Sequence, residues 1–336
     1  AEVSERKLGD RDGAAECYRK ILRLDPDNLD ALRGLHRLHR LAERWDELAE
    51  VCSRLAKVVY DDQERVLLFR EAGTLYEGTL ERRDEAAVCF RALAEADPLD
   101  RDAAIALERL YDKLGRPQDL AFALELRRAQ EGGNAAGREA AFRLAELKRN
   151  VLNDPAGALQ IFEQIIADDP AHTGVRTALE AWAKSGGSGC LDAVRLIDPV
   201  LERAGEHPRR VALREARLGG ASGAEKARLA AEIRHIDEVD MGRPELAFMA
   251  ACRHWAEGID REQVQPELER LARDTNNIEA LADVYEEAAE SAHPGDDHAV
   301  IALRRAAQLR AQLGEFEKAV GLWKDLLQEV PGDREG

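Results

Sequence analysis

Aromatic residues are scarce in this sequence, at 5% of 336 residues, and proline occurs only 11 times. A β-sandwich or β-barrel needs aromatic and β-branched strands that are separated by frequent turns. The shortage of aromatic residues therefore disfavours both architectures. Hydrophobic residues still amount to 45%, which is enough to bury a continuous core and argues against a wholly disordered chain.

Long apolar runs are also absent. No window approaches 18 uncharged apolar residues, so we expect no membrane insertion. The five cysteines are odd in number and form no Cys-x-x-Cys pair, which disfavours a disulfide framework and a zinc site. Unpaired thiols suit a reducing compartment, so we expect a cytoplasmic location. Because residue 1 is Ala, we expect the N-terminus of a longer parent protein to be missing.

Acidic residues dominate the charge of the chain. The 66 Asp and Glu residues outnumber the 49 Lys and Arg residues, which gives a net charge of −17. A negative protein repels phosphate backbones, so we expect no nucleic-acid partner.

An internal repeat organises the chain. The segments Ala14–Pro26, Ala86–Pro98 and Ala158–Pro170 read AAECYRKILRLDP, AAVCFRALAEADP and ALQIFEQIIADDP, so their closing prolines are 72 residues apart. A fourth copy, Ala319–Pro331, reads AVGLWKDLLQEVP, and a diverged copy lies at 245–257. The step from the third copy to the diverged copy exceeds 72 by 17 residues, which predicts one insertion of about that length.

Each 72-residue unit is predicted to contain four helices that form two antiparallel hairpins. In the first full unit we expect helices at about 29–42, 45–60, 63–80 and 84–96. Leu32, Leu35 and Leu38 recur at three-residue steps, as on one apolar face of a helix. The Asp-Pro pairs end helices because proline lacks the backbone N–H and disfavours helical geometry in the residue before it. Turns inside hairpins are expected at glycines, namely Gly9, Gly115 and Gly314.

These units resemble tandem tetratricopeptide repeats, whose 34-residue motif places large, small and aromatic residues at set positions of two helices. The last repeat offers Leu303, Ala306, Ala307, Gly314, Ala319, Trp323, Leu326 and Pro331 at those positions. The third offers Phe69, Ala72, Gly73, Tyr76, Ala86, Phe90, Leu93 and Pro98. The chain is most similar to segments of very long bacterial multi-repeat proteins. The resemblance implies an all-α fold, a right-handed α-solenoid of about nine antiparallel helical hairpins that forms a superhelix.

Three segments are predicted along the chain. Residues 1–183 form a regular array with the 72-residue double-repeat period, and residues 226–336 form a second array. Residues 184–225 depart from the pattern, because they contain KSGGSGC, LGGASG and two prolines. We expect this segment to be an irregular break that holds the 17 extra residues. It is either an added or broken helix near 208–218 or a loosened repeat without a role.

No residue pattern for catalysis, a cofactor or a metal ion is recognisable. Phosphate-binding, dinucleotide-binding and nucleophile-elbow motifs do not occur. His36 and His39 lie three residues apart, but no third metal ligand is implied. Cys17 and Cys89 occupy equivalent repeat positions, which indicates packing. We therefore predict no enzyme activity and no catalytic, cofactor-binding or metal-binding residue.

Candidate peptide-binding residues lie on the first helices of the hairpins, which in this family line the concave groove of the solenoid. They are Arg33, Arg37, Arg40, Arg70, Arg109 and Lys113. The first three follow i, i+4, i+7 spacing and share one helix face. On an acidic protein, such a patch would steer an acidic peptide or a chain-terminal carboxylate into the groove. The alternative is an ordinary solvated face.

The carboxylate-clamp members of the family have an asparagine at positions that are Arg37, Thr74 and Arg109 here, so that specific function is not carried over. Two hypotheses follow. The first is a non-catalytic scaffold that binds peptide segments or partner domains on the concave face. The second is a structural spacer or self-associating segment of a longer repeat protein. Enzyme activity is a third hypothesis, and the sequence favours it least.

Overall fold

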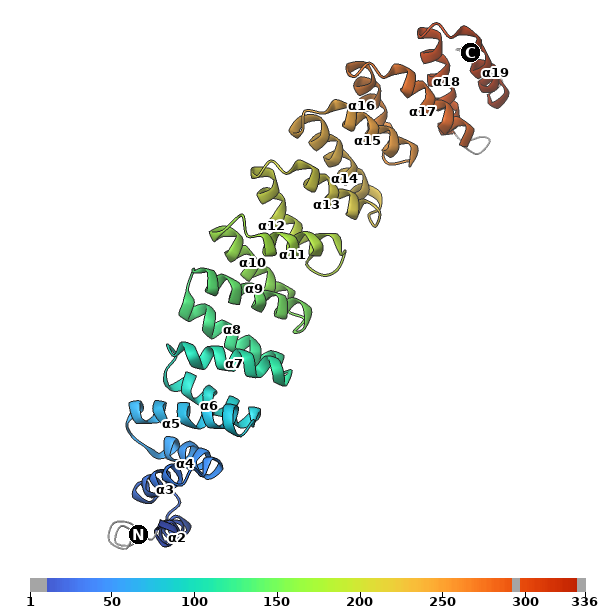
Figure 1. The fold of residues 1–336 in the computed structure, drawn as a ribbon. Coiled ribbons are helices and arrows are strands. Elements are labelled where there is room, and N and C mark those ends of the chain that lie inside the picture. Colours follow the sequence, from blue (N-terminus) through green and yellow to red (C-terminus); the bar gives the residue numbers. More distant parts are fainter. Residues whose placement is uncertain (1–10, 292–296, 331–336) are drawn as a thin grey trace. The chain divides into compact units, whose positions relative to one another are not determined.

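A computed structural model describes residues 11–291 and 297–330. These residues form eighteen α-helices and two π-helical turns, with no strand among them, so the all-α prediction is confirmed. The chain divides into two compact units, Ala1–Val175 and Arg176–Gly336. Within each unit, consecutive helices pack against one another as in an α-solenoid (Figure 1).

The first unit consists of α2 followed by four hairpins, α3–α4, α5–α6, α7–α8 and α9–α10. Its helices are α2 (Arg11–Leu24), α3 (Leu29–Leu41), α4 (Trp45–Val58), α5 (Asp62–Thr74) with the π-turn η1 (Leu75–Thr79), α6 (Arg83–Ala96), α7 (Arg101–Leu114), α8 (Pro117–Glu131), α9 (Ala135–Asn150) and α10 (Pro155–Asp168). The four helices that the sequence predicted between 29 and 96 agree with α3 to α6 within about two residues.

The second unit contains the hairpins α11–α12, α14–α15, α16–α17 and α18–α19. Its helices are α11 (Thr173–Lys184), which spans the division between the units, α12 (Cys190–Arg203), α13 (His207–Leu218), α14 (Gly223–His235) with the π-turn η2 (Ile236–Asp240), α15 (Pro244–Ala256), α16 (Arg261–Asp274), α17 (Ile278–Ser291), α18 (Asp297–Gln312) and α19 (Phe316–Glu329). Eight hairpins together with α2 and α13 are described, in agreement with the expected nine or so. None of the described helices is both long and apolar enough to cross a bilayer.

Helix α13 lies outside the helical hairpins, between α12 and α14. The first helices α5 and α14 both end in a π-turn, and each is followed by a residue with positive φ, Glu81 or Gly242, before its partner helix begins. This equivalence pairs α14 with α15 and leaves α13 outside the hairpins. Residues 184–225, expected as an irregular break, contain α12 and α13 and are mostly helical. Pro208 lies in the first turn of α13, where a missing N–H breaks no helical hydrogen bond.

The turn inside most hairpins contains one residue in the left-handed region, with φ between 52° and 81°. These residues are Glu43, Glu81, Gly115, Asn153, Gly242, Asn276 and Gly314. The sequence predicted the turns at Gly115 and Gly314, whereas Gly9 lies outside the described residues. The non-glycine members were not predicted because a side chain disfavours this conformation.

Helix ends follow local chemistry. The helices α2, α6 and α10 end two residues before Pro26, Pro98 and Pro170, as predicted; Pro331 lies outside the described residues. At the start of α3, the Asn28 side chain accepts a hydrogen bond from the Ala31 backbone N–H at 3.0 Å. Asp100 caps α7 through Ala103 in the same way, at 2.9 Å. Such caps stabilise a helix by about 1 kcal/mol each.

The repeated aromatic position belongs to the core. Tyr18, Phe90 and Phe162 are all buried, which stabilises the fold by about 2–3 kcal/mol per side chain. Two of these rings lie against glycines of neighbouring first helices: a Cβ atom added at Gly34 would lie 2.4 Å from Tyr18 Cζ, and one at Gly73 would lie 3.0 Å from Phe90 Cε2. The glycines therefore let the rings approach the helix backbone.

Candidate protein-binding surface

The first helices of the first unit are joined in series by ion pairs. Arg33 on α3 donates two hydrogen bonds to Glu64 on α5, at 3.2 Å and 2.7 Å. Arg109 on α7 holds Glu77 of η1 in the same way, at 2.9 Å and 2.7 Å. Two-point contacts between a guanidinium and a carboxylate are geometrically specific. They therefore link each first helix to the next in a defined register.

Arg40 and Arg70 are paired as well. Arg40 on α3 binds Glu71 on α5, and Arg70 on α5 binds Asp100, the N-cap residue of α7. Burial alone raises the pKa of the Glu71 carboxyl, but hydrogen bonds from Arg40 and His36 outweigh burial and hold that pKa below its usual value. Four of the six predicted cations are thus already compensated by carboxylates of the neighbouring repeat.

The two remaining predicted cations are exposed. Arg37 lies on α3 between the paired Arg33 and Arg40, and it too has an interaction partner. Lys113, near the end of α7, forms no ion pair with any residue in the described ranges. The structure therefore brings the six residues to three consecutive first helices, but as part of a mixed surface of both charges.

The sequence analysis missed the acidic members of this surface, Glu64, Glu71 and Glu77. A signal for two of them existed. The second and ninth positions of a repeat face the groove in the resembled family, and in the repeat from 63 these positions are Glu64 and Glu71. At the ninth position the repeats from 29, 63 and 101 carry Arg37, Glu71 and Arg109, so basic and acidic residues alternate there.

Exposed apolar side chains accompany the ion pairs. Leu67 on α5 is 63% exposed and lies one helical turn from both Glu64 and Glu71. Ile105 on α7 is 44% exposed and lies one turn before Arg109. Leu41 ends α3 and is also exposed. We call the exposed side of α3, α5 and α7 the first-helix face; its residues are Arg33, Arg37, Arg40, Leu41, Glu64, Leu67, Arg70, Glu71, Glu77, Ile105, Arg109 and Lys113.

The second helices of the first unit carry a separate series of ion pairs. The arginine just before α4, α6 and α8 binds an aspartate in the first turn of the preceding second helix. The pairs are Arg44 with Asp12, Arg82 with Asp46 and Arg116 with Asp84. Ion pairs between repeats are therefore a general feature of the stacking, and pairing alone does not mark a binding surface.

The second unit repeats the pattern. Arg270 on α16 donates two hydrogen bonds to Glu238 of η2, at 2.8 Å and 2.7 Å, and these hydrogen bonds to the carboxylate raise the pKa of Arg270 above its usual value. Arg234 on α14 binds Glu267 on α16 at 2.9 Å. First helices of both units are thus linked by arginine–carboxylate contacts.

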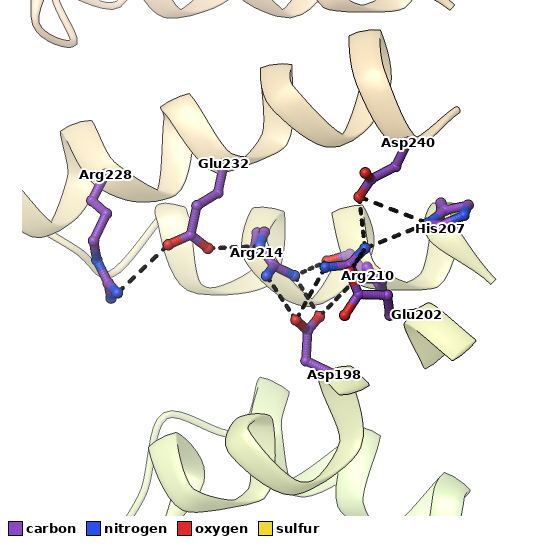
Figure 2. A network of polar contacts seen from close by, with 8 residues as sticks. All are labelled: Asp198, Glu202, His207, Arg210, Arg214, Arg228, Glu232 and Asp240. Atoms are coloured by element: carbon purple, nitrogen blue, oxygen red, sulfur yellow. Dashed lines mark hydrogen bonds and ion pairs between the residues drawn. The ribbon is translucent and has the colours of Figure 1, made fainter. Parts of the chain in front are cut away.

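Helix α13 is held by a buried network of charges (Figure 2). Asp198 on α12 accepts hydrogen bonds from both Arg210 and Arg214 on α13. Arg214 continues to Glu232 on α14 at 2.8 Å, and Arg210 continues to Asp240 of η2 at 2.7 Å. The arginine side chains are only 8% and 10% exposed. The network therefore adds buried ion pairs to the apolar contacts of Leu213 and Leu218 on α13.

Potential metal ligands gather at one further place in the first unit. His36, Cys52 and Glu71 each offer one ligand atom, and these atoms lie within 4.8 Å of one another. His39, the partner of His36 in the sequence analysis, is instead buried, and burial lowers its pKa. The sequence analysis did not predict this cluster, because its three members lie on three different helices.

Comparisons with known proteins support the repeat family for one hairpin. Residues 139–172, which cover most of α9 and α10, match the family model of the tetratricopeptide repeat. This match confirms the resemblance for that hairpin. No curated protein sequence matches the chain.

Similar solved structures are also tetratricopeptide repeat proteins. One is the TPR domain of P58(IPK), with 16% identity, 91% of this chain and 85% of that chain covered, and a TM-score of 0.28. Another is YrrB, described as a TPR protein with an unusual peptide-binding site, with 18% identity, 52% and 86% covered, and a TM-score of 0.27. A third, a tetratricopeptide repeat protein from Parabacteroides merdae, has 16% identity, 80% and 97% covered, and a TM-score of 0.27. At such low TM-scores these likenesses carry no further argument.

Proposed function

We propose that the chain, which contains a tetratricopeptide repeat at residues 139–172, is a non-catalytic scaffold that binds a peptide segment of a partner protein on the first-helix face. The repeat itself supports protein–protein interaction in general terms. The observation that supports this particular face is its combination of exposed Leu41, Leu67 and Ile105 with ion pairs on three consecutive first helices.

The apolar side chains would provide most of the affinity. Four of the cations are already paired, so a carboxylate of the ligand must replace an internal partner and gains little net energy. The exposed Leu67 and Ile105 lose water on contact without such an exchange. Lys113, which forms no ion pair within the described ranges, then favours acidic residues beside the apolar anchors. The expected ligand is a short peptide with spaced apolar side chains and flanking Asp or Glu.

The test is a selection of displayed random peptides on the immobilised chain, followed by measurement of each affinity with fluorescent peptide. Leu67→Lys should weaken binding of the enriched peptides at least about tenfold, since it removes an anchor worth about 1.5 kcal/mol. Val88→Lys is the matched control, because Val88 on the second helix α6 is equally exposed at 63%. Equal losses in both variants, or no enrichment of any peptide, would contradict the proposal.

A charge variant tests separately whether a cation contributes to peptide affinity. Lys113→Gln should reduce the affinity for acidic peptides and the salt dependence of binding, while the apolar contacts persist. If the enriched peptides contain no acidic residues, or if the substitution leaves their affinity unchanged, this cation does not contribute to the binding site.

Self-association is a second candidate function, and a specific observation on α19 favours it. Phe316, Val320 and Leu327 lie on one side of this helix and are exposed by 68%, 51% and 38%. Val320 and Leu327 correspond in register to Ala87 and Ala94 of α6, which are buried in the first unit. We therefore propose that this side of α19 is a stacking surface. Sedimentation velocity of the chain and of Val320→Lys tests it: a dimer that the substitution dissociates is expected, and a monomer at all concentrations excludes it.

A further inference from the structure

We propose that His36, Cys52 and Glu71 form a binding site for one Zn²⁺ ion in the first unit. Each residue comes from a different helix, His36 from α3, Cys52 from α4 and Glu71 from α5. Their ligand atoms lie within 4.8 Å of one another, and His36 Nε2 is 3.0 Å from Glu71 Oε2. The site goes beyond the proposed peptide-binding function and does not depend on it.

The donor set matches zinc. Imidazole nitrogen, thiolate sulfur and carboxylate oxygen are the three ligand types that zinc takes in proteins, at about 2.0–2.3 Å. Tetrahedral bonds of that length place ligand atoms roughly 3–4 Å apart, so only a small closure of the cluster is required. Mg²⁺ and Ca²⁺ are excluded by the thiolate, because these hard cations prefer oxygen ligands. Three protein ligands leave the fourth position for water.

The charges balance when zinc binds. The ion displaces the proton of the Cys52 thiol, which leaves to solvent, and neutral His36 binds through Nε2 with its proton on Nδ1. One Zn²⁺, one thiolate and one carboxylate then sum to zero, as a partly buried site requires. The Cys52 side chain is fully buried, whereas His36 and Glu71 are 19% and 23% exposed. The ion therefore reaches the cluster from the side of the imidazole and carboxylate.

Arg40 borders the cluster and fits the second shell of such a site. It binds the other oxygen of Glu71, Oε1, and leaves Oε2 facing His36. A carboxylate that binds metal is usually oriented by a hydrogen bond of this kind. The guanidinium also lies 3.4 Å from His36 Nε2, so it must turn away from that atom when the ion enters. Its side chain is 55% exposed, which leaves room for this movement.

The next double repeat shows that stacking does not need this donor set. At positions 72 residues later, His36, Cys52 and Glu71 become Glu108, Leu124 and Arg143. There, Arg143 and Arg127 bind the Glu108 carboxylate in a self-contained ion pair. Both copies therefore contain a guanidinium–carboxylate contact, Arg40 with Glu71 in the first and Arg127 and Arg143 with Glu108 in the second, but only the first places a histidine and a cysteine beside it.

The experiment uses the full chain after treatment with EDTA. Titration with ZnCl₂ against a chromophoric chelator should show one tight site per chain, and the melting temperature of the chain should rise because the ion binds only the folded state. CoCl₂ should give a thiolate-to-cobalt charge-transfer absorption band. Cys52→Ala should abolish that band. It should also weaken zinc binding by more than about 100-fold, because loss of an outer-shell partner already weakens a metal site by up to about that factor.

Two further variants keep the test independent of core packing. His36→Gln and Glu71→Gln change half-buried residues and should each weaken zinc binding while far-UV circular dichroism stays unchanged. Cys89→Ala is the matched control, since Cys89 is another buried thiol on a second helix, and it should leave both the affinity and the cobalt band intact. Absence of a one-to-one site, or a cobalt band that survives in Cys52→Ala, would overturn the proposal.

Discussion

Asp198 on α12 and Arg214 on α13 are joined by two parallel hydrogen bonds, of 2.8 Å from Nη1 to Oδ1 and 3.1 Å from Nη2 to Oδ2. Arg210 binds the same carboxylate, so two buried guanidinium groups share one aspartate, and Glu232 and Asp240 supply the further negative charges. Asp198 is therefore the main polar link between α12 and α13.

Asp198→Asn should loosen α13. The substitution keeps the shape of the side chain but leaves two buried positive charges without their shared carboxylate, which costs about 3 kcal/mol. Hydrogen exchange of the α13 backbone amides measures this local free energy. Asp192→Asn is the control, because Asp192 is an exposed aspartate on α12, the helix that carries Asp198. Its substitution should alter the free energy of local opening by less than about 0.5 kcal/mol. Equal exchange in both variants would show that the network does not hold the helix.

The same contact predicts a loss of stability in acid. Burial raises the pKa of Asp198, but hydrogen bonds from Arg214 and Arg210 outweigh burial and lower that pKa below its usual value. The stabilisation is therefore complete above the pKa of the unfolded chain, about 4, and is lost as the pH falls through the lower pKa of the folded chain. Exchange of the α13 amides should accelerate in that range for the natural chain and much less for Asp198→Asn.

His254 predicts a second loss of stability in acid, which arises from a group that becomes charged when it binds a proton. Burial, together with the nearby Arg234 and Arg253, lowers the pKa of His254 to about 4. Between pH 6.5 and 4 the unfolded chain binds a proton here that the folded chain does not, so stability falls by about 3 kcal/mol as the pH is lowered. Urea unfolding of His254→Gln should show a shallower decline than the natural chain, whereas the exposed His235→Gln should match the natural chain.

Gly34→Ala should destabilise the first unit by about 1–3 kcal/mol, because the new Cβ atom would overlap the Tyr18 ring, 2.4 Å from Cζ. Gly78→Ala is the control within the same unit, since a Cβ atom there meets nothing within 4 Å. It should be neutral or slightly stabilising. Thermal unfolding measures both, and a neutral Gly34→Ala would mean that Tyr18 moves without cost.

Glu81→Gly should stabilise the α5–α6 turn by about 1 kcal/mol. Glu81 has a φ of 55°, which a side chain disfavours, and the equivalent turn in the second unit uses Gly242 with a φ of 62°. The reciprocal change, Gly242→Glu, should destabilise its turn by a similar amount. Chemical unfolding of the two variants checks both signs; a loss of stability in Glu81→Gly would show that glycine entropy dominates.

The sequence determined the local architecture of this protein. The 72-residue period, the apolar positions at three- and four-residue steps, and the Asp-Pro pairs predicted the bounds of α3 to α6 closely, because helix formation and termination depend on residues within a few positions of one another. The resemblance to tetratricopeptide repeats followed from the same local pattern. The turn at Glu81 escaped prediction because nothing in its neighbourhood favours a left-handed residue.

Tertiary structure decided what the exposed and buried polar groups do. Arg33 and Glu64 are 31 residues apart, and the sequence alone showed a cationic patch where the packed helices show neutralised pairs. The network around Asp198 and the cluster of His36, Cys52 and Glu71 likewise join several helices. Electrostatic and ligand contacts of this kind depend on distances of a few ångströms between separate elements, and only the packing of those elements sets such distances.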